Sequence, residues 1–316
     1  MTAETVEPTS RYDASGAQAR EDWLARMEVI FEEDGHFDPV GPRHHAWFAD
    51  QGPTLLVSFE SYDSVRARPT QVPGAQAVAD DQGWSHLCLI AEGETWYRDP
   101  YVYRYFDRLV DDAFFEDFDR VLFYGAGIGG YAACAFSVCA PGATVLAISP
   151  RATLNPDQAG WDRRHLSARK LCFTDRFGYA PAMIEGTAQT FVVFDPRQAE
   201  DAMHAALLAA PYVHKLRTPF LGDRVESALA NMEILPQLLT AAGQGSLTPA
   251  MFHQLWRKRR VFGPYLRDLL AANHAEGKHH REVMICNSVI ARSGAPKFRR
   301  YLAWLKSSGR LPGGES

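Results

Sequence analysis

Short apolar runs alternate with helix-like stretches over most of the chain. The apolar runs are rich in β-branched and aromatic residues, which is typical of strands buried on both faces. The predicted strands are residues 54–59, 86–91, 120–124, 144–149 and 190–195, with a less apolar one at 212–216. Apolar residues at helical spacing predict helices at 21–33, 100–115, 130–140, 199–209 and 225–239. This alternation predicts an α/β fold, with a mostly parallel sheet covered by helices on both faces.

The pattern changes near residue 240, where strand signals fade. Further helices are predicted at residues 251–260, 264–272, 282–291 and 296–305. We therefore divide the chain into a disordered lead-in (1–20), an α/β domain (21–240), a basic helical C-terminal extension (241–308) and a flexible tail (309–316). The longest apolar runs are too short to cross a bilayer, and the polar N-terminus lacks a signal core, so a cytoplasmic protein is expected.

Charge is unevenly distributed along the chain. The formal net charge is −5, yet 13 of the 33 lysines and arginines and only 4 of the 38 acidic residues lie after residue 240. Two interpretations remain open. The basic helices fold back onto the acidic body, or they bind an anionic partner such as a polyanionic glycan or a membrane surface. No nucleic-acid motif accompanies the basic run Trp-Arg-Lys-Arg-Arg at 256–260, so nucleic acid is not an expected partner.

The most informative motif is a glycine-rich turn that follows the predicted strand 120–124. Gly125, Gly127, Gly129 and Gly130 lie between this strand and the next predicted helix. Their spacing fits two arrangements. One is Gly-x-Gly-x-x-Gly, a loop that holds phosphate. The other is Gly-x-Ser-x-Gly, the turn that presents the nucleophilic serine of a hydrolase.

The phosphate-loop interpretation lacks its expected partner. A nicotinamide-binding fold places an acidic residue at the end of the next strand, where it binds ribose hydroxyls. Here that strand ends in Ser149, Pro150 and Arg151, so the acid is absent. Arg151 offers a contact to a 2′-phosphate instead, although Pro150 restricts the loop.

In the hydrolase interpretation only one of three catalytic positions keeps its residue type. Gly127 occupies the serine position and has no side chain that could attack a substrate. Asp195 ends the predicted strand 190–195, where the acid of the triad is expected. The histidine is expected in the loop after the last strand, and Asp223 stands there. Without nucleophile and base, no acyl-enzyme chemistry is predicted.

These motifs resemble a divergent bacterial branch of the α/β-hydrolase-fold proteins, met in surface-polysaccharide and glycosyltransferase contexts. Active members carry Gly-Ser-Ser-Met-Gly-Gly-Tyr-Ala-Ala where residues 125–133 of this chain read Gly-Ala-Gly-Ile-Gly-Gly-Tyr-Ala-Ala. Residues 55–60, Leu-Leu-Val-Ser-Phe-Glu, resemble the strand that leads into the oxyanion loop. The resemblance covers residues 50–240 and implies an α/β-hydrolase-like domain with a nucleophile elbow and a degenerate catalytic triad.

The resemblance implies a pseudoenzyme that binds or scaffolds, in glycan or surface-polysaccharide assembly. The elbow still offers an anion-binding corner, formed by the backbone N–H of Ile128 and a donor near Phe59. Two enzymatic alternatives use the same pocket. One is nucleotide-dependent chemistry with NAD(P) or a sulfonucleotide, although the serine-glycine-rich loop and cysteine-containing tail of a sulfonucleotide reductase are absent. The other is a carboxylate-based hydrolase in which Asp195 and Asp223 pair.

Three further side chains complete the predicted ligand site. Arg151 would contact an anion. Trp96 and Tyr97 follow a predicted strand end and offer aromatic surfaces to a sugar or a base. The ligand is expected to be a small molecule or a glycan.

The remaining cysteines and histidines are not assigned to the site. The five cysteines are scattered and are interpreted as core residues. The pairs His44–His45 and His279–His280 lack further ligands at suitable spacing and are interpreted as solvated loops. No metal site and no cofactor are therefore predicted.

Overall fold

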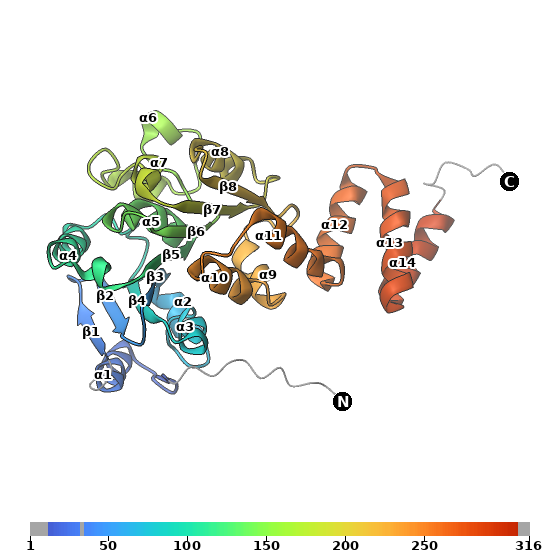
Figure 1. The fold of residues 1–316 in the computed structure, drawn as a ribbon. Helices are drawn as coiled ribbons and strands as arrows, with labels where there is room; N and C mark the ends of the chain where they lie inside the picture. Colours follow the sequence, from blue (N-terminus) through green and yellow to red (C-terminus); the bar gives the residue numbers. More distant parts are fainter. Residues whose placement is uncertain (1–11, 32–34, 309–316) are drawn as a thin grey trace.

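The computed structural model describes residues 12–31 and 35–308, and its centre is a twisted sheet (Figure 1). Eight strands of the described chain form this sheet, in the order β1-β2-β4-β3-β5-β6-β7-β8. β2 pairs antiparallel with β1 and β4, and the remaining neighbours are parallel. The strands are β1 (Gly35–Pro39), β2 (His44–Ala49), β3 (Thr54–Ser61), β4 (Ser85–Ala91), β5 (Arg120–Ala126), β6 (Thr144–Ile148), β7 (Gln189–Phe194) and β8 (Val213–Arg217).

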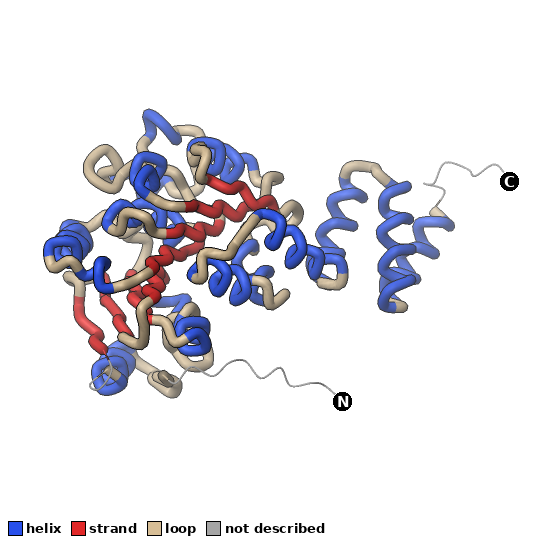
Figure 2. Tube along the Cα trace, viewed as in Figure 1, coloured by secondary structure: helices blue, strands red, loops and turns tan. Residues whose placement is uncertain are grey.

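Helices cover both faces of the sheet (Figures 1 and 2). α4, α5, α7 and α8 contribute to the core on one face, and α3, α9, α10 and α11 to the core on the other. The α-helices are α1 (Arg20–Ile30), α2 (Tyr62–Arg66), α3 (Gln76–Gln82), α4 (Pro100–Asp111), α5 (Ile128–Phe136), α6 (Pro156–Ala159), α7 (Ala180–Met183), α8 (Ala199–Leu207), α9 (Val225–Asn231), α10 (Leu235–Gly243), α11 (Pro249–Leu255), α12 (Gly263–Ala275), α13 (His279–Ser293) and α14 (Pro296–Ser307).

The central strands divide the apolar interior into two cores. Leu55, Val57 and Phe59 of β3 point into the core beneath α4 and α5, whereas Leu56 between them points into the core beneath α10. This alternation follows from the period-2 geometry of a strand. Every one of these side chains is buried, which is why the strands appear in the sequence as continuous apolar runs.

The predicted parallel sheet is confirmed, and the two antiparallel strands were missed. β3 to β8 match the six predicted strands closely. β1 and β2 are separated by Gly41-Pro42, and β2 begins with His44-His45, which the sequence analysis assigned to a solvated loop. That assignment is wrong, because His44 and His45 are buried in β2 and His44 Nε2 lies 2.8 Å from Thr95 Oγ1. Buried histidines look polar in a sequence and so hide a strand.

The predicted disordered lead-in is partly wrong. Residues 1–11 lie outside the described residues, but Tyr12 and the residues after it belong to the fold. The Tyr12 ring stacks on Phe31 at 5.1 Å and meets Trp47 edge-on at 5.3 Å. Trp23 and Met27 of α1 are fully buried in the same cluster. The N-terminal helix therefore packs against the antiparallel edge of the sheet.

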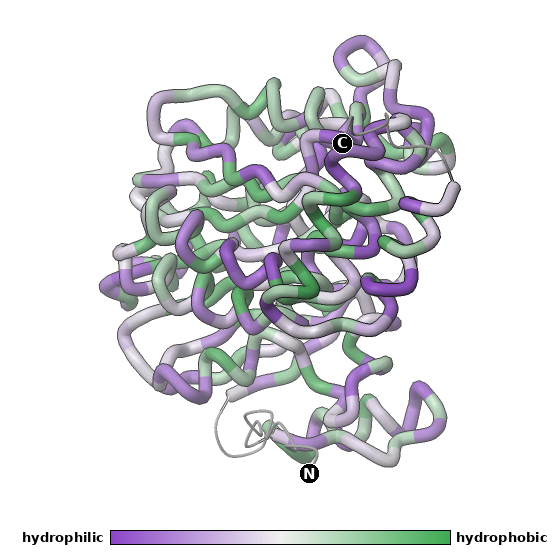
Figure 3. The backbone as a smooth tube through the Cα atoms, turned by 90° about the vertical axis from the view of Figure 1, so that its right-hand side faces the viewer, coloured by the Kyte–Doolittle hydropathy of each residue, from purple (hydrophilic) through white to green (hydrophobic). Residues whose placement is uncertain are grey.

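The C-terminal extension begins later than residue 241. That boundary falls inside α10, which packs across β3, β5 and β6. Only α12, α13 and α14 stand to one side of the sheet (Figure 1). Seen from that side in Figure 3, hydrophilic and hydrophobic stretches alternate along the chain. Within residues 12–31 and 35–308, no helix has the length and hydropathy that crossing a bilayer requires. The tail at 309–316 lies outside the described residues.

In the ion pairs between the extension and the body, the expected signs are reversed. Among the described residues, Arg197 of the body pairs with Glu276 at 2.5 Å, and Arg224 of the body pairs with Asp268 at 2.6 Å. The extension thus contributes the acid in both pairs. Folding of basic helices onto an acidic body therefore does not explain the excess of arginine and lysine in the extension.

Candidate functional site

The glycine-rich turn forms a sharp elbow between β5 and α5. Gly127 caps the helix with φ 56° and ψ −112°, a backbone conformation that residues other than glycine rarely adopt. Its N–H donates to the carbonyl of Ile148 on β6 at 2.8 Å, which fixes the turn against the sheet. A Cβ built on Gly127 would meet no atom within 4 Å. The position where a hydrolase carries its nucleophile therefore faces open space.

The other glycines of the turn are required by backbone packing. A Cβ on Gly125 would lie 2.2 Å from the carbonyl oxygen of Gly129, and one on Gly129 would lie 2.3 Å from that of Phe59. A Cβ on Gly130 would approach the carbonyl of Ile148 to 2.9 Å. These contacts account for the glycine spacing without a bound phosphate, since each glycine permits one chain segment to pass another.

A cavity of about 270 Å³ lies beside the elbow, at the carboxyl ends of β5 and β6. Parallel sheets bind their ligands at this end of the strands. We refer to it as the elbow cavity. It is lined by Ala126, Gly127, Ile148, Ser149, Arg151, Arg164, Gln198, Asp201, Asp223, Val225 and Glu226. A larger cavity of about 610 Å³ lies at the opposite end, against the first residues of β5 and β6, and is not part of this site.

Two arginines and two aspartates form an ion-pair network along one wall. Asp201 Oδ1 lies 2.7 Å from Arg164 Nη1 and 3.3 Å from Arg151 Nη1. Asp162 Oδ2 lies 2.7 Å from Arg164 Nη2 and 3.8 Å from Arg151 Nε. The formal charges of these four groups cancel. The corner predicted to bind anions is therefore polar but carries no net positive charge from these four groups. The buried Nε of Arg151 makes no hydrogen bond to the described residues.

His204 is fully buried and makes a hydrogen bond to Asp162 of this network. Its Nδ1 accepts a hydrogen bond from the N–H of Ala152 at 3.2 Å, so Nε2 carries the proton and donates to Asp162 Oδ2 at 3.0 Å. Burial lowers the pKa of His204 to about 4, and the bond to Asp162 offsets this only in part. Both ring nitrogens are engaged, so His204 is not free to act as a general base.

Glu226 separates the elbow cavity from a second cavity of about 270 Å³, which Glu60, Arg68 and Tyr124 help to line. The Tyr124 hydroxyl donates to Glu226 Oε1 at 2.6 Å. Burial raises the pKa of Glu226 above its usual value, and the bond from Tyr124 lowers it in part. Arg68 does not compensate this charge directly, because it pairs with Glu60 at 2.6 Å.

The two predicted acids of the triad take different places. Asp195 is buried, and its Oδ2 accepts hydrogen bonds from the N–H groups of Leu221 at 2.9 Å and Gly222 at 2.8 Å. Its Oδ1 accepts from the N–H of Arg197 at 2.8 Å. Asp223 is exposed and lines the elbow cavity. Asp195 therefore holds the loop that carries Asp223, and its oxygens are occupied by backbone groups.

The predicted aromatic platform lies in the core. Trp96 is fully buried and Tyr97 nearly so, and the Tyr97 hydroxyl donates to the carbonyl of Glu60 at 3.0 Å. Phe59 is also a core side chain, within a strand that pairs on both sides. These three residues cannot meet a ligand through their side chains. Ile128 does lie at the elbow, as the first residue of α5.

Several residues of the cavity lining and of the ion-pair network beside it were not found from the sequence. Asp162 and Arg164 belong to the long connection between β6 and β7, Asp201 to α8 and Glu226 to α9. These segments are far apart in the chain and meet only above the carboxyl ends of the strands. The one local signal is the polar run after Trp161, Asp-Arg-Arg-His, which contains two members of the network.

With this geometry the fold is α/β-hydrolase-like. No family model matches the sequence, and no curated protein matches it. A solved glycosylation-associated protein complex (Gap123) from Streptococcus agalactiae aligns with a TM-score of 0.45 and 12% identity over 67% of this chain and 47% of that one. This chain thus spans less than half the length of that relative.

Two solved esterases align over more of their own length. Carboxyl esterase 2 from Tuber melanosporum aligns with a TM-score of 0.43 and 14% identity, over 69% of this chain and 90% of that one. An esterase from Pyrococcus furiosus aligns with a TM-score of 0.42 and 13% identity, over 74% and 100%. These remote likenesses concern the fold, and the site is argued from its own residues.

We expect Asp195 to be a structural residue. Asp195→Asn should lower the free energy of unfolding by about 1–3 kcal/mol, because an amide replaces one acceptor with a donor that faces backbone N–H groups. Asp223→Asn, at an exposed position, should change it by less than about 0.5 kcal/mol. Urea denaturation followed by circular dichroism measures both. An equal loss of unfolding free energy in the two variants would show that Asp195 does not hold the loop.

The neutral His204 should make stability depend on pH. An unfolded histidine binds a proton below about pH 6.5, whereas folded His204 resists protonation until about pH 4. Its contribution is therefore complete above pH 6.5 and is lost as the pH falls toward 4. Between pH 7 and 4.5 the wild type should lose about 2 kcal/mol more unfolding free energy than His204→Gln. His280→Gln, at an exposed position, should show the same pH dependence as wild type. If His204→Gln also shows it, the assignment of a neutral His204 is wrong.

Proposed function

We propose that this protein is a non-hydrolytic member of the α/β-hydrolase fold, which binds a ligand at the elbow instead of cleaving one. The observation that carries the proposal is Gly127. The elbow keeps the sharp turn that normally exposes a nucleophile, but the side chain is absent and its direction is open. The loop position for the base carries Asp223, and Asp195 is bonded to backbone groups.

The lining of the elbow cavity favours a small ligand rich in hydroxyl groups. Polar side chains such as Gln198 and Asp223 line it, while Ile148 and Val225 supply apolar surface. A sugar ring presents the same mixture of hydroxyls and apolar faces. The volume of about 270 Å³ suits one such ring.

An acidic group on that sugar would find donors at one end of the cavity. The first N–H groups of α5, beginning at Ile128, have no partner within the helix and point toward its N-terminal end. Arg151 and Arg164, which line the cavity, add two cationic side chains. We therefore propose an acidic sugar residue as the ligand. A role in glycan or surface-polysaccharide assembly follows from the sequence resemblance alone.

The enzymatic alternatives gain less support. Backbone contacts at Gly125 and Gly129 explain the glycine spacing, which was the reason to consider a nucleotide loop. A carboxylate pair would need Asp195 free to act, but three N–H groups occupy its oxygens.

A covalent probe tests the loss of hydrolase chemistry. Wild-type protein should not hydrolyse p-nitrophenyl esters and should not react with a fluorophosphonate, because no activated nucleophile faces the elbow cavity. Mass spectrometry after probe treatment measures this directly. Labelling of Ser149, the serine that lines the cavity, would overturn the proposal.

Ligand binding tests the positive half of the proposal. D-glucuronate should bind the wild type, as measured by calorimetry or saturation-transfer NMR, and Gly127→Leu should weaken it at least about tenfold by filling the cavity. Gly142→Leu is the matched control. It also has a positive φ and no atom near its Cβ, but it lies at the opposite end of the sheet. Tight binding of NADP⁺ that is lost in Gly127→Leu would instead favour the nucleotide alternative.

A further inference from the structure

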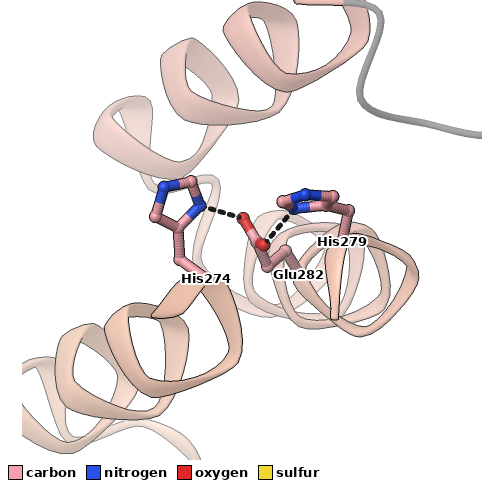
Figure 4. Close-up of side chains that lie close together, drawn as sticks. All are labelled: His274, His279 and Glu282. Atoms are coloured by element: carbon pink, nitrogen blue, oxygen red, sulfur yellow. Dashed lines mark hydrogen bonds and ion pairs between the residues drawn. The ribbon is translucent and has the colours of Figure 1, made fainter. Parts of the chain in front are cut away.

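Three side chains of metal-binding type converge where α12 meets α13, away from the elbow cavity (Figure 4). His274 lies in the last turn of α12, and His279 and Glu282 lie one turn apart at the start of α13. Glu282 Oε1 is 2.7 Å from His279 Nδ1, and its Oε2 is 3.3 Å from His274 Nδ1. One potential ligand atom from each residue lies within 4.8 Å of the other two.

These separations are close to those of ligands that share one ion. Ligand atoms about 2.1 Å from a tetrahedral Zn²⁺ lie about 3.4 Å from each other. The two nitrogen–oxygen separations of 2.7 and 3.3 Å lie at or below this value, and all three ligand atoms lie within 4.8 Å of one another. Two histidines and one glutamate also form a known zinc ligand set, with the fourth position left to water.

The burial of Glu282 is the second observation. Its side chain is fully buried, yet its hydrogen-bond and ion-pair partners among the described residues are the two imidazoles and the Tyr301 hydroxyl. None of them is a lysine or an arginine. These partners stabilise the charged carboxylate by hydrogen bonds but supply no permanent cation, which a divalent ion would add. Tyr301, from α14, donates to Glu282 Oε2 at 2.5 Å and orients the carboxylate.

We propose that His274, His279 and Glu282 bind one Zn²⁺ ion that fastens α13 to α12. The two histidines flank the short connection between these helices, so an ion shared by them closes the helical hairpin. The apolar core of α13 and α14 is small, with Cys286, Val289, Leu302 and Leu305 as its buried members. A metal link supplements such a core by adding binding free energy to folding.

The pair His279–His280, expected in a solvated loop, instead begins α13. The structure separates the two histidines: His279 turns inward at the first residue of α13, and His280 is exposed. The remaining ligands, His274 and Glu282, lie at spacings that match no familiar zinc motif. They become neighbours only when α12 and α13 fold against each other.

Zinc binding to the full-length chain tests the proposal. EDTA-treated wild type should bind one Zn²⁺ per chain by calorimetry, and its melting temperature should rise by about 3 °C or more with excess Zn²⁺. His279→Gln and Glu282→Gln should each weaken binding at least about a hundredfold. His280→Gln, the exposed neighbour, should bind as wild type. Co²⁺ in place of Zn²⁺ should give visible absorption that His279→Gln abolishes.

Circular dichroism in EDTA identifies a variant that has simply unfolded. If Glu282→Gln unfolds, the comparison of His279→Gln with His280→Gln still decides the outcome. Absence of stoichiometric Zn²⁺ binding to the wild type overturns the proposal. So does equal binding by His279→Gln and wild type, or loss of binding in His280→Gln, because either result assigns the ion to other residues.

Discussion

The close passage of backbone segments at the β5–α5 elbow is the constraint on which the rest of this structure depends. α5 lies so near β3, β5 and β6 that Cβ atoms on Gly125 and Gly129 would come within 2.3 Å of carbonyl oxygens. This approach seats the helix at the centre of the sheet and opens a cavity beside its first residue. The same packing would serve a hydrolase, since it positions residue 127 at the apex of the turn. Here the apex is Gly127, which leaves the space beside the turn open.

The wall opposite the elbow depends on a balance of buried charge. Arg151, Asp162, Arg164 and Asp201 neutralise one another, and the neutral imidazole of His204 completes the hydrogen bonding of Asp162. Removing one member would leave a partner charge uncompensated in a poorly hydrated place. The network joins the long connection after β6 to α8, and so fixes the shape of the cavity entrance. A balanced wall of this kind suits a polar ligand with a single acidic group better than a polyanion.

The C-terminal helices are held by a different physical means. Their basic residues do not make the ion pairs that join them to the body. Arg197 and Arg224 of the body contact Glu276 and Asp268 instead. The positive charge of the extension therefore remains on its surface, where an anionic partner would meet it. Within the extension, the buried carboxylate of Glu282 lies where α12 and α13 meet, beside a small apolar core.

The apolar runs predict the parallel part of the sheet, because strands buried on both faces must be continuously apolar. The glycine spacing locates the elbow, because glycine is required where two backbone segments touch. The assignments of Gly127 to a nucleophile position and of Asp195 to a catalytic acid remain predictions. The sequence did not reveal β1, or β2 with its buried His44 and His45, which look polar, or the burial of Trp96 and Tyr97. Only the tertiary structure decided which charges line the cavity and which histidines meet Glu282. Those residues come from segments far apart in the chain, and hydrophobic periodicity carries no information about which polar side chains will face each other after folding.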